Sequence, residues 1–381
     1  MDFSLAAEQS LLVEQLAAFA REELAPGYRA RDRAAVFPQE LWRRLGALGV
    51  FGLRVPAEHG GADVDCVTAG LAIEAIARGD SNICYGMLNA CFAGEMLGRF
   101  ASDAVKRRWL PPLAAGEAYV CVGLTEPHCG SDAAALRTRA RRDGDDYVLS
   151  GEKAGMTGLM AGAAAIIFAR TDPDAGARGV SAFLAPLDSA GLSRAPYDDL
   201  GARAIGRGSL FLDEVRVPAE NLIGPLNGAF SAVMQTFDYT RALIGLQCLG
   251  AAQTAIAETV DYVKNRSAFG RPISTNQGVS FPIAEWSAKL EAARWLCLRT
   301  LWLRDRGLPH TKEAAMCKLL GPDIAAQAIH ACLVLHGHYG YTTDFAIEQR
   351  LRDAVGLEIA DGTPQIQKLI IAREIFGRGF V

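Results

Sequence analysis

Residues 119–132 read Tyr-Val-Cys-Val-Gly-Leu-Thr-Glu-Pro-His-Cys-Gly-Ser-Asp, and here the chain changes character. The first half of this stretch is a short apolar run that predicts a β-strand, and the second half is a polar loop. Before it, apolar residues recur at helical spacing, and after it short strand-like runs follow one another. The regions on either side of this stretch therefore determine the fold.

Helical periodicity dominates residues 1–115. Ala and Leu recur three and four positions apart, and Pro-Gly and Gly-Gly pairs interrupt the pattern at 26–27 and 60–61. We therefore expect a helical N-terminal domain over this range. Its predicted helices, after a first one through 11–19, span 38–48, 66–78 and 81–100.

Short apolar runs separated by turn residues fill residues 116–226. The pair Asp143-Gly144 between two of these runs indicates a β-hairpin. Strands of this length and spacing are typical of a small β-barrel or sandwich, which we expect as the middle domain. The predicted strands cover 119–124, 136–140, 147–149, 165–168, 180–184 and 210–217.

Long helical segments return at residue 227 and continue to residue 381. Short connections between them favour an antiparallel four-helix bundle as the C-terminal domain. The predicted helices cover 229–266, 276–307 and 312–335, and a last one begins at Pro364. The predicted fold class is therefore mainly α with a central β domain.

Composition argues against several classes of protein. With 39 basic and 43 acidic residues in 381, the net charge of −4 gives no electrostatic reason to bind nucleic acid. No run of 18 apolar residues predicts a membrane span, and the N-terminus lacks the pattern of a signal peptide. The nine cysteines show no metal-ligand spacing, so we expect reduced thiols and a cytoplasmic protein.

The loop at 124–132 carries polar groups that suit a cofactor. Thr125 and Ser131 place hydroxyls on a backbone with free N–H groups, which can pair with the polar edge of a ring. The same residues also fit an ordinary connection between strands, with Ser131-Asp132 forming a local turn. The loop by itself leaves both interpretations open.

The order of motifs resembles the acyl-CoA dehydrogenase family over residues 2–378. The loop matches the family pattern TEP-x-x-GSD at 125–132. In that family the loop contacts the flavin ring of FAD, and its serine lies near both the cofactor and the substrate thioester. The resemblance therefore implies FAD contacts at Leu124, Thr125 and Ser131, and a substrate contact at Ser131.

A second family motif, G-x-K-x-W-I-T-N, reads Gly-Glu-Lys-Ala-Gly-Met-Thr-Gly at 151–158. The resemblance implies flavin contacts at Gly155, Met156 and Thr157, with Thr157 hydrogen-bonded near flavin N5. Gly155 departs from the family tryptophan, which packs on one face of the ring. Losing that side chain removes stacking area and leaves a void, which we expect neighbouring side chains to fill.

The segment 237–241 contains two charged residues, Asp238 and Arg241, that share one helix face. We place this segment at a helix start. On its own the pair fits an exposed ion pair of small energetic weight. The resemblance instead implies that both residues contact the substrate along the acyl-CoA channel, with Arg241 beside the active site.

Two further motifs of the family are R-x-x-F-G, at 266–270, and Q-x-x-G-G-x-G-Y, at 334–341. In the family they complete the FAD site of a neighbouring subunit, which implies a homo-oligomer, usually a tetramer. A cation followed by glycine also fits a simple helix C-terminus. Val334 and His338 depart from the family glutamine and glycine, and we interpret His336 and His338 as a turn rather than a metal site. The implied FAD contacts are Arg266, Phe269, Gln277, Val334, Gly337 and His338.

The stretch 358–367 reads Glu-Ile-Ala-Asp-Gly-Thr-Pro-Gln-Ile-Gln and predicts a loop that leads into a helix. As residue types, Asp361 and Gly362 are a common turn pair. They also match the family motif Y-E-G-T-x-Q-I-Q, whose glutamate is the catalytic base. The resemblance implies that Asp361 is the base, that Gly362 lies against the substrate, and that Thr363 and Gln365 contact the cofactor. Aspartate is one methylene shorter, so its reach differs.

The resemblance implies an FAD-dependent acyl-CoA dehydrogenase. Asp361 would take the α-proton of an acyl thioester, the β-hydrogen would pass to flavin N5 as hydride, and an electron-transfer flavoprotein would accept the electrons. The departures at Gly155, Val334 and Asp361 keep an alternative open: a thioester oxidase, flavin hydroxylase or lyase of the same fold, or action on a carrier-protein-bound acyl group. A nucleic-acid-associated binding protein is a third possibility, against which the acidic balance counts.

Overall fold

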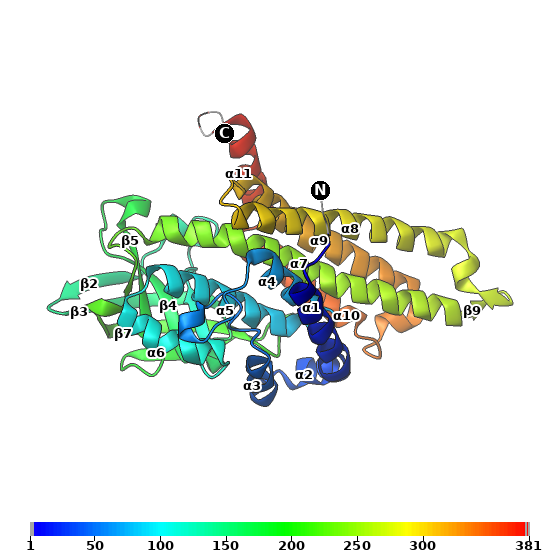
Figure 1. Ribbon diagram of the computed structural model, residues 1–381, viewed down its shortest axis with the longest axis horizontal. Coiled ribbons are helices and arrows are strands. Elements are labelled where there is room, and N and C mark those ends of the chain that lie inside the picture. Colours follow the sequence, from blue (N-terminus) through cyan, green and yellow to red (C-terminus); the bar gives the residue numbers. More distant parts are fainter. Residues whose placement is uncertain (1–3, 378, 380–381) are drawn as a thin grey trace.

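Helix caps define the N-terminal part of the computed structural model, which describes residues 4–377 and 379 (Figure 1). The side chains of Asp65, Asp80 and Ser102 each accept a hydrogen bond from a backbone N–H in the first turn of the helix that follows. The helical character expected for this region is confirmed. Its α-helices are α1 (Ala7–Phe19), α2 (Tyr28–Ala34), α3 (Gln39–Ala47), α4 (Cys66–Ala77), α5 (Ser81–Phe100) and α6 (Asp103–Ala114).

The middle of the chain forms one sheet in the order β6-β7-β3-β2-β4-β5-β8, with β1 paired in parallel to β4. The expected hairpin is present: β2 and β3 are antiparallel, Asp143 faces Asp146, and Gly144 adopts the positive φ of a tight turn. The strands are β1 (Val120–Gly123), β2 (Arg139–Asp143), β3 (Asp146–Thr157), β4 (Ala164–Arg170), β5 (Val180–Pro186), β6 (Leu192–Pro196), β7 (Arg207–Pro218) and β8 (Leu222–Ile223). The expected extents of the domains stay a prediction.

Long antiparallel helices make up the C-terminal part, as expected (Figure 1). They are α7 (Ala229–Asn265), α8 (Gln277–Asp305), α9 (Thr311–Leu335) and α10 (Ile347–Ile359), followed by α11 (Pro364–Phe376). A small hairpin of β9 (Ser267–Ala268) and β10 (Arg271–Pro272) joins α7 to α8. α7 and α9 are long and apolar enough to cross a membrane by length and composition, yet 67% of the most apolar window of α7 is buried inside the molecule.

One expectation about this region is wrong, and one helix is missing from the prediction. The segment 237–241 is not a helix start, because α7 begins eight residues earlier at Ala229 and runs unbroken through it. The helix α10 is not foreseen in the sequence at all. Its buried residues include Gln349, Arg350 and Asp353, so apolar periodicity does not mark it.

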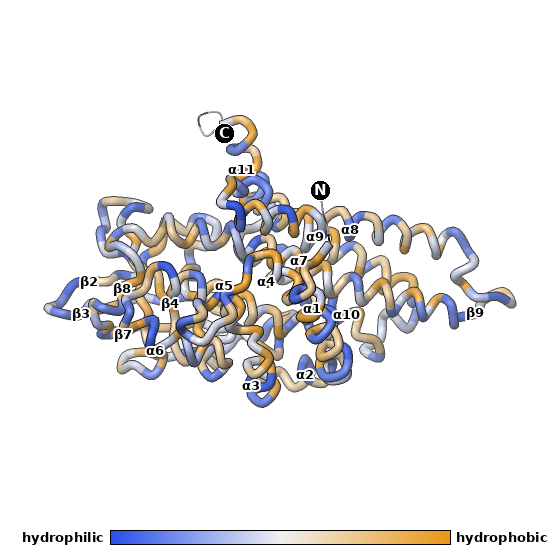
Figure 2. Tube along the Cα trace, viewed as in Figure 1, coloured by the Kyte–Doolittle hydropathy of each residue, from blue (hydrophilic) through white to orange (hydrophobic). Residues whose placement is uncertain are grey.

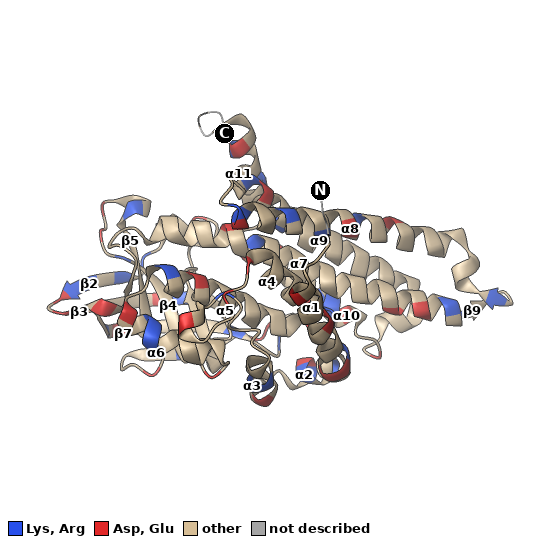
Figure 3. Ribbon diagram, viewed as in Figure 1, with Lys and Arg blue, Asp and Glu red and all other residues tan. Residues whose placement is uncertain are grey.

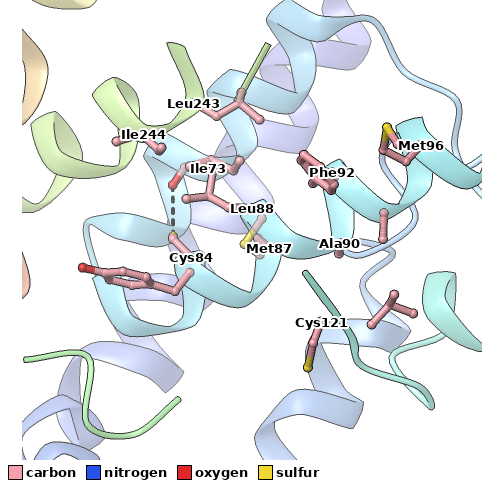
Figure 4. Packing of buried hydrophobic residues seen from close by; sticks show 14 of the residues in the cluster. Ile73, Cys84, Met87, Leu88, Ala90, Phe92, Met96, Cys121, Leu243 and Ile244 are labelled. Carbon is pink, nitrogen blue, oxygen red and sulfur yellow. Dashed lines mark hydrogen bonds between the residues drawn. The ribbon is translucent and has the colours of Figure 1, made fainter. Parts of the chain in front are cut away.

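The core spans the joint between the N-terminal helices and the bundle. Figure 4 shows Ile73 of α4, Cys84, Leu88 and Phe92 of α5, and Leu243 and Ile244 of α7 packed together. Small residues allow these helices to approach closely: a Cβ at Gly70 would lie 2.4 Å from Leu301 of α8 and 2.8 Å from Leu246 of α7. The cysteines described, Cys248 and Cys332 among them, are buried thiols that behave as small core residues.

A buried carboxylate, Asp353 of α10, links three parts of the chain. One of its oxygens accepts hydrogen bonds from Tyr28 Oη (2.5 Å) and Asn82 Nδ2 (2.6 Å), and the other accepts one from the Ala202 backbone N–H (2.7 Å). Ser81 Oγ lies 3.3 Å from the first oxygen. Burial raises the pKa of Asp353 to about 7, although these hydrogen bonds act in the opposite direction. Asp353 thus fixes α10 against α2, α5 and the β6–β7 loop.

The raised pKa of Asp353 predicts a pH dependence of stability. Below pH 7 the folded protein holds a proton that an unfolded aspartate releases, so stability should fall as the pH rises through about 7. In Asp353→Asn this part of the dependence should vanish, because the amide does not titrate. Urea unfolding between pH 5 and 8 measures it, with the exposed Asp174→Asn as the control. Parallel pH profiles of wild type and Asp353→Asn would contradict the assignment.

Candidate active site

Asp361 lies in the four-residue connection between α10 and α11, and its side chain faces the bundle. Both Asp361 (φ +54°) and Gly362 (φ +101°) adopt left-handed backbone conformations, which confirms the expected turn. Thr240 of α7 lies close enough to lower the pKa of the carboxyl group through its hydroxyl, and Lys318 of α9 and Arg241 of α7 do so through their charges. Asp361 is thus partly buried among polar groups.

The environment of Asp361 suits a base. Burial raises the pKa of its carboxyl group, and Lys318, Arg241 and Thr240 offset part of that rise. A carboxylate with a raised pKa is a stronger base than an exposed aspartate, yet two neighbouring cations keep its charged form accessible.

Two buried side chains that the sequence analysis does not single out hold this turn. Lys318 Nζ donates to the carbonyl oxygens of Glu358 (3.3 Å) and Gly362 (3.1 Å). Gln367 Nε2 donates to the carbonyls of Asp361 (3.2 Å) and Gly362 (3.0 Å). The sequence signal that could have identified Lys318 is a lysine at a position of the predicted helix 312–335 that is otherwise apolar. Thr363 stands at the N-cap of α11, as expected, but its side chain makes no capping hydrogen bond.

Arg241 is buried and bonded to Asp238, so the interpretation of this pair as an exposed ion pair is wrong. Arg241 Nη1 lies 2.7 Å from Asp238 Oδ1, and the two side chains are 6% and 13% exposed. The other oxygen of Asp238 accepts a hydrogen bond from Thr311 Oγ1 at 2.7 Å. Burial lowers the pKa of Arg241, and the charges of Asp238 and Asp361 counteract that effect.

A cleft of about 680 Å³ opens beside Asp238, between α5, α7 and the α8–α9 connection. Glu95 lies in its wall and bonds Arg54 (3.0 Å) and Arg304 (2.6 Å). Arg54 Nε and His310 Nε2 are buried there without a hydrogen-bond partner among the described residues. The charged side chains of the lining are Arg54, Glu95, Arg99, Asp238, Arg304 and Asp305.

The loop at 124–132 is held on its inner side by a buried lysine, and its outer side is exposed. Lys153 of β3 is fully buried, and its Nζ donates to Glu126 Oε1 (2.7 Å) and to the carbonyl of Leu124 (3.2 Å). Thr125 and Ser131 are exposed on the outer side, whereas Leu124 is buried. His128 and Cys129 lie beside Glu126 in a cluster of possible metal ligands. The Glu126 oxygens, however, already accept hydrogen bonds from Lys153 and from two backbone N–H groups.

Gly155 lies next to this loop, in an irregular part of the β3–β7 pairing. Its φ is +65°, and its N–H donates to Tyr197 Oη at 3.3 Å. A Cβ built there would meet only Arg207 Nη1, at 3.9 Å. Tyr197 and Arg207 are therefore the nearest candidates to occupy the space of the family tryptophan. Met156 points into the β-domain core, while Thr157 is partly exposed.

The remaining expected FAD contacts fall into two places. Thr363 and Gln365 lie at the Asp361 turn, next to Gly362, the expected substrate contact. The other set lies at the opposite end of the long helices, near the β9–β10 hairpin in Figure 1. One chain does not bring these two sets together. In the distant set Phe269 is fully exposed and Val334 is 60% exposed. Its members are Arg266, Phe269, Gln277, Val334, Gly337 and His338.

The turn after α9 is structural, as expected. His336 is buried and stacks on Tyr262, with ring centroids 4.1 Å apart, and Tyr262 Oη donates to its carbonyl. Burial lowers the pKa of the His336 ring. His338 is exposed on the following 3₁₀ turn, Gly337–Tyr341. The two histidines thus occupy different environments.

Three family models match the chain in order. They are the N-terminal, middle and C-terminal domains of acyl-CoA dehydrogenase, over residues 6–117, 121–215 and 227–376. The probable acyl-CoA dehydrogenase YngJ of Bacillus subtilis is 35% identical over 98% of this chain and 100% of its own length.

Solved structures agree in fold. The butyryl-CoA dehydrogenase of Megasphaera elsdenii superposes with a TM-score of 0.95 at 30% identity, covering 99% of this chain and 100% of that one. A Mycobacterium smegmatis glutaryl-CoA dehydrogenase in complex with FADH2 gives 0.92 at 29%, covering 98% and 96%. The prolyl acyl carrier protein oxidase AnaB gives 0.94 at 27%, covering 98% and 100%.

These matches cover all three regions and the loop, strand and turn described above. Exposed hydroxyls at Thr125 and Ser131, beside the open space at Gly155, fit a flavin ring. The chain belongs to the acyl-CoA dehydrogenase family and is an oxidoreductase with FAD as its cofactor.

Proposed function

We propose that this protein introduces a double bond between Cα and Cβ of an acyl thioester, with Asp361 as the base. The Asp361 carboxylate takes the α-proton while the β-hydrogen leaves with its electron pair, so the carbon–carbon double bond forms as both C–H bonds break. Bound FAD supplies the hydride acceptor. The observation that carries this proposal is the left-handed turn at Asp361, which Lys318 and Gln367 hold through its carbonyls while burial raises the pKa of its carboxyl group.

The main contribution of the protein to this reaction is to align the substrate with the base and the cofactor. No side chain fits at position 362, because a Cβ there would lie 2.5 Å from Gln367 Nε2, so the turn presents bare backbone beside the proposed base. The exposed hydroxyls of Thr125 and Ser131 lie on the cofactor side, and Thr363 and Gln365 lie at the turn. Donors that face the thioester carbonyl stabilise the charge that develops on its oxygen as the α-proton leaves.

We place the polar part of the substrate, the pantetheine and phosphate groups attached to the thioester sulfur, in the cleft beside Asp238. Three arginines line its wall, Arg54, Arg99 and Arg304, and His310 lies there as well. Both coenzyme A and the phosphopantetheine of a carrier protein have amides and phosphate that such a wall can bind. We propose acyl-CoA as the substrate, with a carrier-protein thioester as the alternative because AnaB is named for a carrier-protein substrate.

We also propose a homo-oligomer, a tetramer by analogy with the family. Large apolar side chains are exposed on the distant FAD-contact set and on α11, which leaves the body of the molecule and carries apolar residues along its length (Figure 2). Burial of such side chains against another copy is favourable. They include Phe269 and Val334 of that set, the nearby Tyr341, and Ile375 and Phe376 of α11.

The electron acceptor we propose is an electron-transfer flavoprotein, in the cytoplasm. Figure 3 shows Lys and Arg interspersed with Asp and Glu along the helices and strands. Oxygen is the alternative acceptor, and the space at Gly155 is the observation that favours it.

Asp361→Asn should keep its flavin and lose its reduction by substrate. The amide preserves the turn but cannot take a proton, so anaerobic bleaching by an acyl-CoA should slow on the order of 100- to 10,000-fold. In wild type the bleaching rate should rise with pH, and its midpoint should lie above the ordinary range of an aspartate because the pKa of Asp361 is raised. The exposed Asp188→Asn is the control. Undiminished bleaching of Asp361→Asn would remove Asp361 from the mechanism.

Air oxidation separates the two acceptors. We expect the substrate-reduced protein to be reoxidised more slowly by dissolved oxygen than by an added electron-transfer flavoprotein. Stopped-flow absorbance of the flavin measures both rates on the same preparation. Reoxidation by air as fast as turnover would favour the oxidase instead.

A further inference from the structure

Lys318 is a buried cation whose hydrogen bonds converge on one short turn. The residue is 2% exposed, and a buried ammonium is stable only when its donors are satisfied. Its described acceptors are the carbonyl oxygens of Glu358 and Gly362, which lie on either side of Asp361 in the sequence. Lys318 therefore spans the turn that carries the proposed base.

The backbone of this turn needs such support. A left-handed conformation at a residue other than glycine is unfavourable, and Asp361 adopts one with φ +54°. Gln367 supplies a second clamp through the carbonyls of Asp361 and Gly362, so Gly362 accepts from both side chains. A donor from α9 and a donor from α11 thus fix the same carbonyl.

Lys318 also acts on Asp361 through its charge. Among the groups that influence the Asp361 carboxyl, Lys318 has the largest favourable effect on the ionised form, followed by Arg241 and Thr240 of α7. Glu358 of α10 faces Lys318 from the same turn, and Asp238 neutralises part of the charge of Arg241. Among the described residues, Lys318 is therefore the cation that both stabilises the negative charge of Asp361 and holds the backbone around it.

We propose that Lys318 is the positioning residue of the proposed reaction: it fixes the turn at Glu358 and Gly362, and its ammonium group stabilises the ionised carboxylate of Asp361. This inference rests on the proposed function, in which Asp361 takes the α-proton. A purely structural role would need only a donor that fills the space. The proposed role needs a positive charge as well, so it predicts a change in the titration of Asp361.

The direct test titrates Asp361 in the FAD-bound protein as purified. Carbon-13 NMR of protein labelled at the aspartate carboxyl carbons follows each group with pH, and Asp361→Asn identifies the resonance of Asp361. In Lys318→Met, which keeps the length but removes the charge, that resonance should titrate at higher pH than in wild type. Lys368→Met, at an exposed lysine on α11, is the matched control and should leave the titration unchanged.

Reduction kinetics give a second readout. At a pH where Asp361 is fully ionised, Lys318→Met should still reduce its flavin on the order of 100-fold more slowly than wild type, because the carboxylate is displaced from the α-carbon. The loss should fall on the maximal rate rather than on the substrate concentration for half-maximal rate. Lys318→Met with wild-type titration and wild-type maximal rate would overturn the inference.

One further variant, together with Asp361→Asn, separates failure of this inference from failure of the proposed function. Lys318→Arg keeps the charge and alters the contact, so its Asp361 should titrate close to wild type while its maximal rate falls. This variant also decides the question if Lys318→Met does not fold, since a wild-type maximal rate in Lys318→Arg would refute the positioning role. Flavin bleaching that survives Asp361→Asn refutes the proposed base instead, whatever Lys318 does.

Discussion

The carboxylate of Asp353 is the interaction on which the rest of the architecture depends. It has 1% exposure, and its hydrogen-bond donors come from α2, α5 and the β6–β7 loop. A buried carboxylate left without these donors would cost several kcal/mol, so α10 can dock only where all of them converge. Because α10 ends two residues before Asp361, the same constraint sets where the proposed base can lie.

Two buried lysines perform the same task at two separate loops. Lys153 lies beneath the 124–132 loop and binds the Leu124 carbonyl and Glu126, and Lys318 lies beneath the 360–363 turn and binds the carbonyls of Glu358 and Gly362. Burial lowers the pKa of both lysines. Burying a charge is less favourable than burying an apolar side chain of similar size, so these lysines need another explanation. We explain them by their effect on loop position: an ammonium group has several donors and fixes a loop from the protein side, while the other side of the loop stays free to bind a ligand.

Apolar periodicity and turn chemistry were enough to predict most elements. The helix 81–100 is predicted to the residue, because Asp80 caps an apolar segment that nothing interrupts, and the predicted 229–266 differs from α7 by one residue. The same method fails for α10, whose buried face is built from Gln349, Arg350 and Asp353 and therefore reads as exposed. The method also fails to identify Lys318 and Gln367, because their polar side chains suggest exposed positions although both are buried. Asp238 and Arg241 are a further case, because a charged pair three residues apart on a helix suggests an exposed ion pair unless the packing around it is known.

The geometry of α7 decides how the cofactor contacts can be completed. Arg241 lies beside Asp361, whereas Arg266 ends the same helix, and a straight helix of that length rises about 38 Å between them. That span exceeds what a single dinucleotide could cover while also keeping its ring beside Asp361. If both groups of residues bind FAD, they must bind different molecules of it, one in each of two copies of the chain. The full exposure of Phe269 and the 91% exposure of Tyr341 at that far end are then the expected appearance of a surface that a second copy covers.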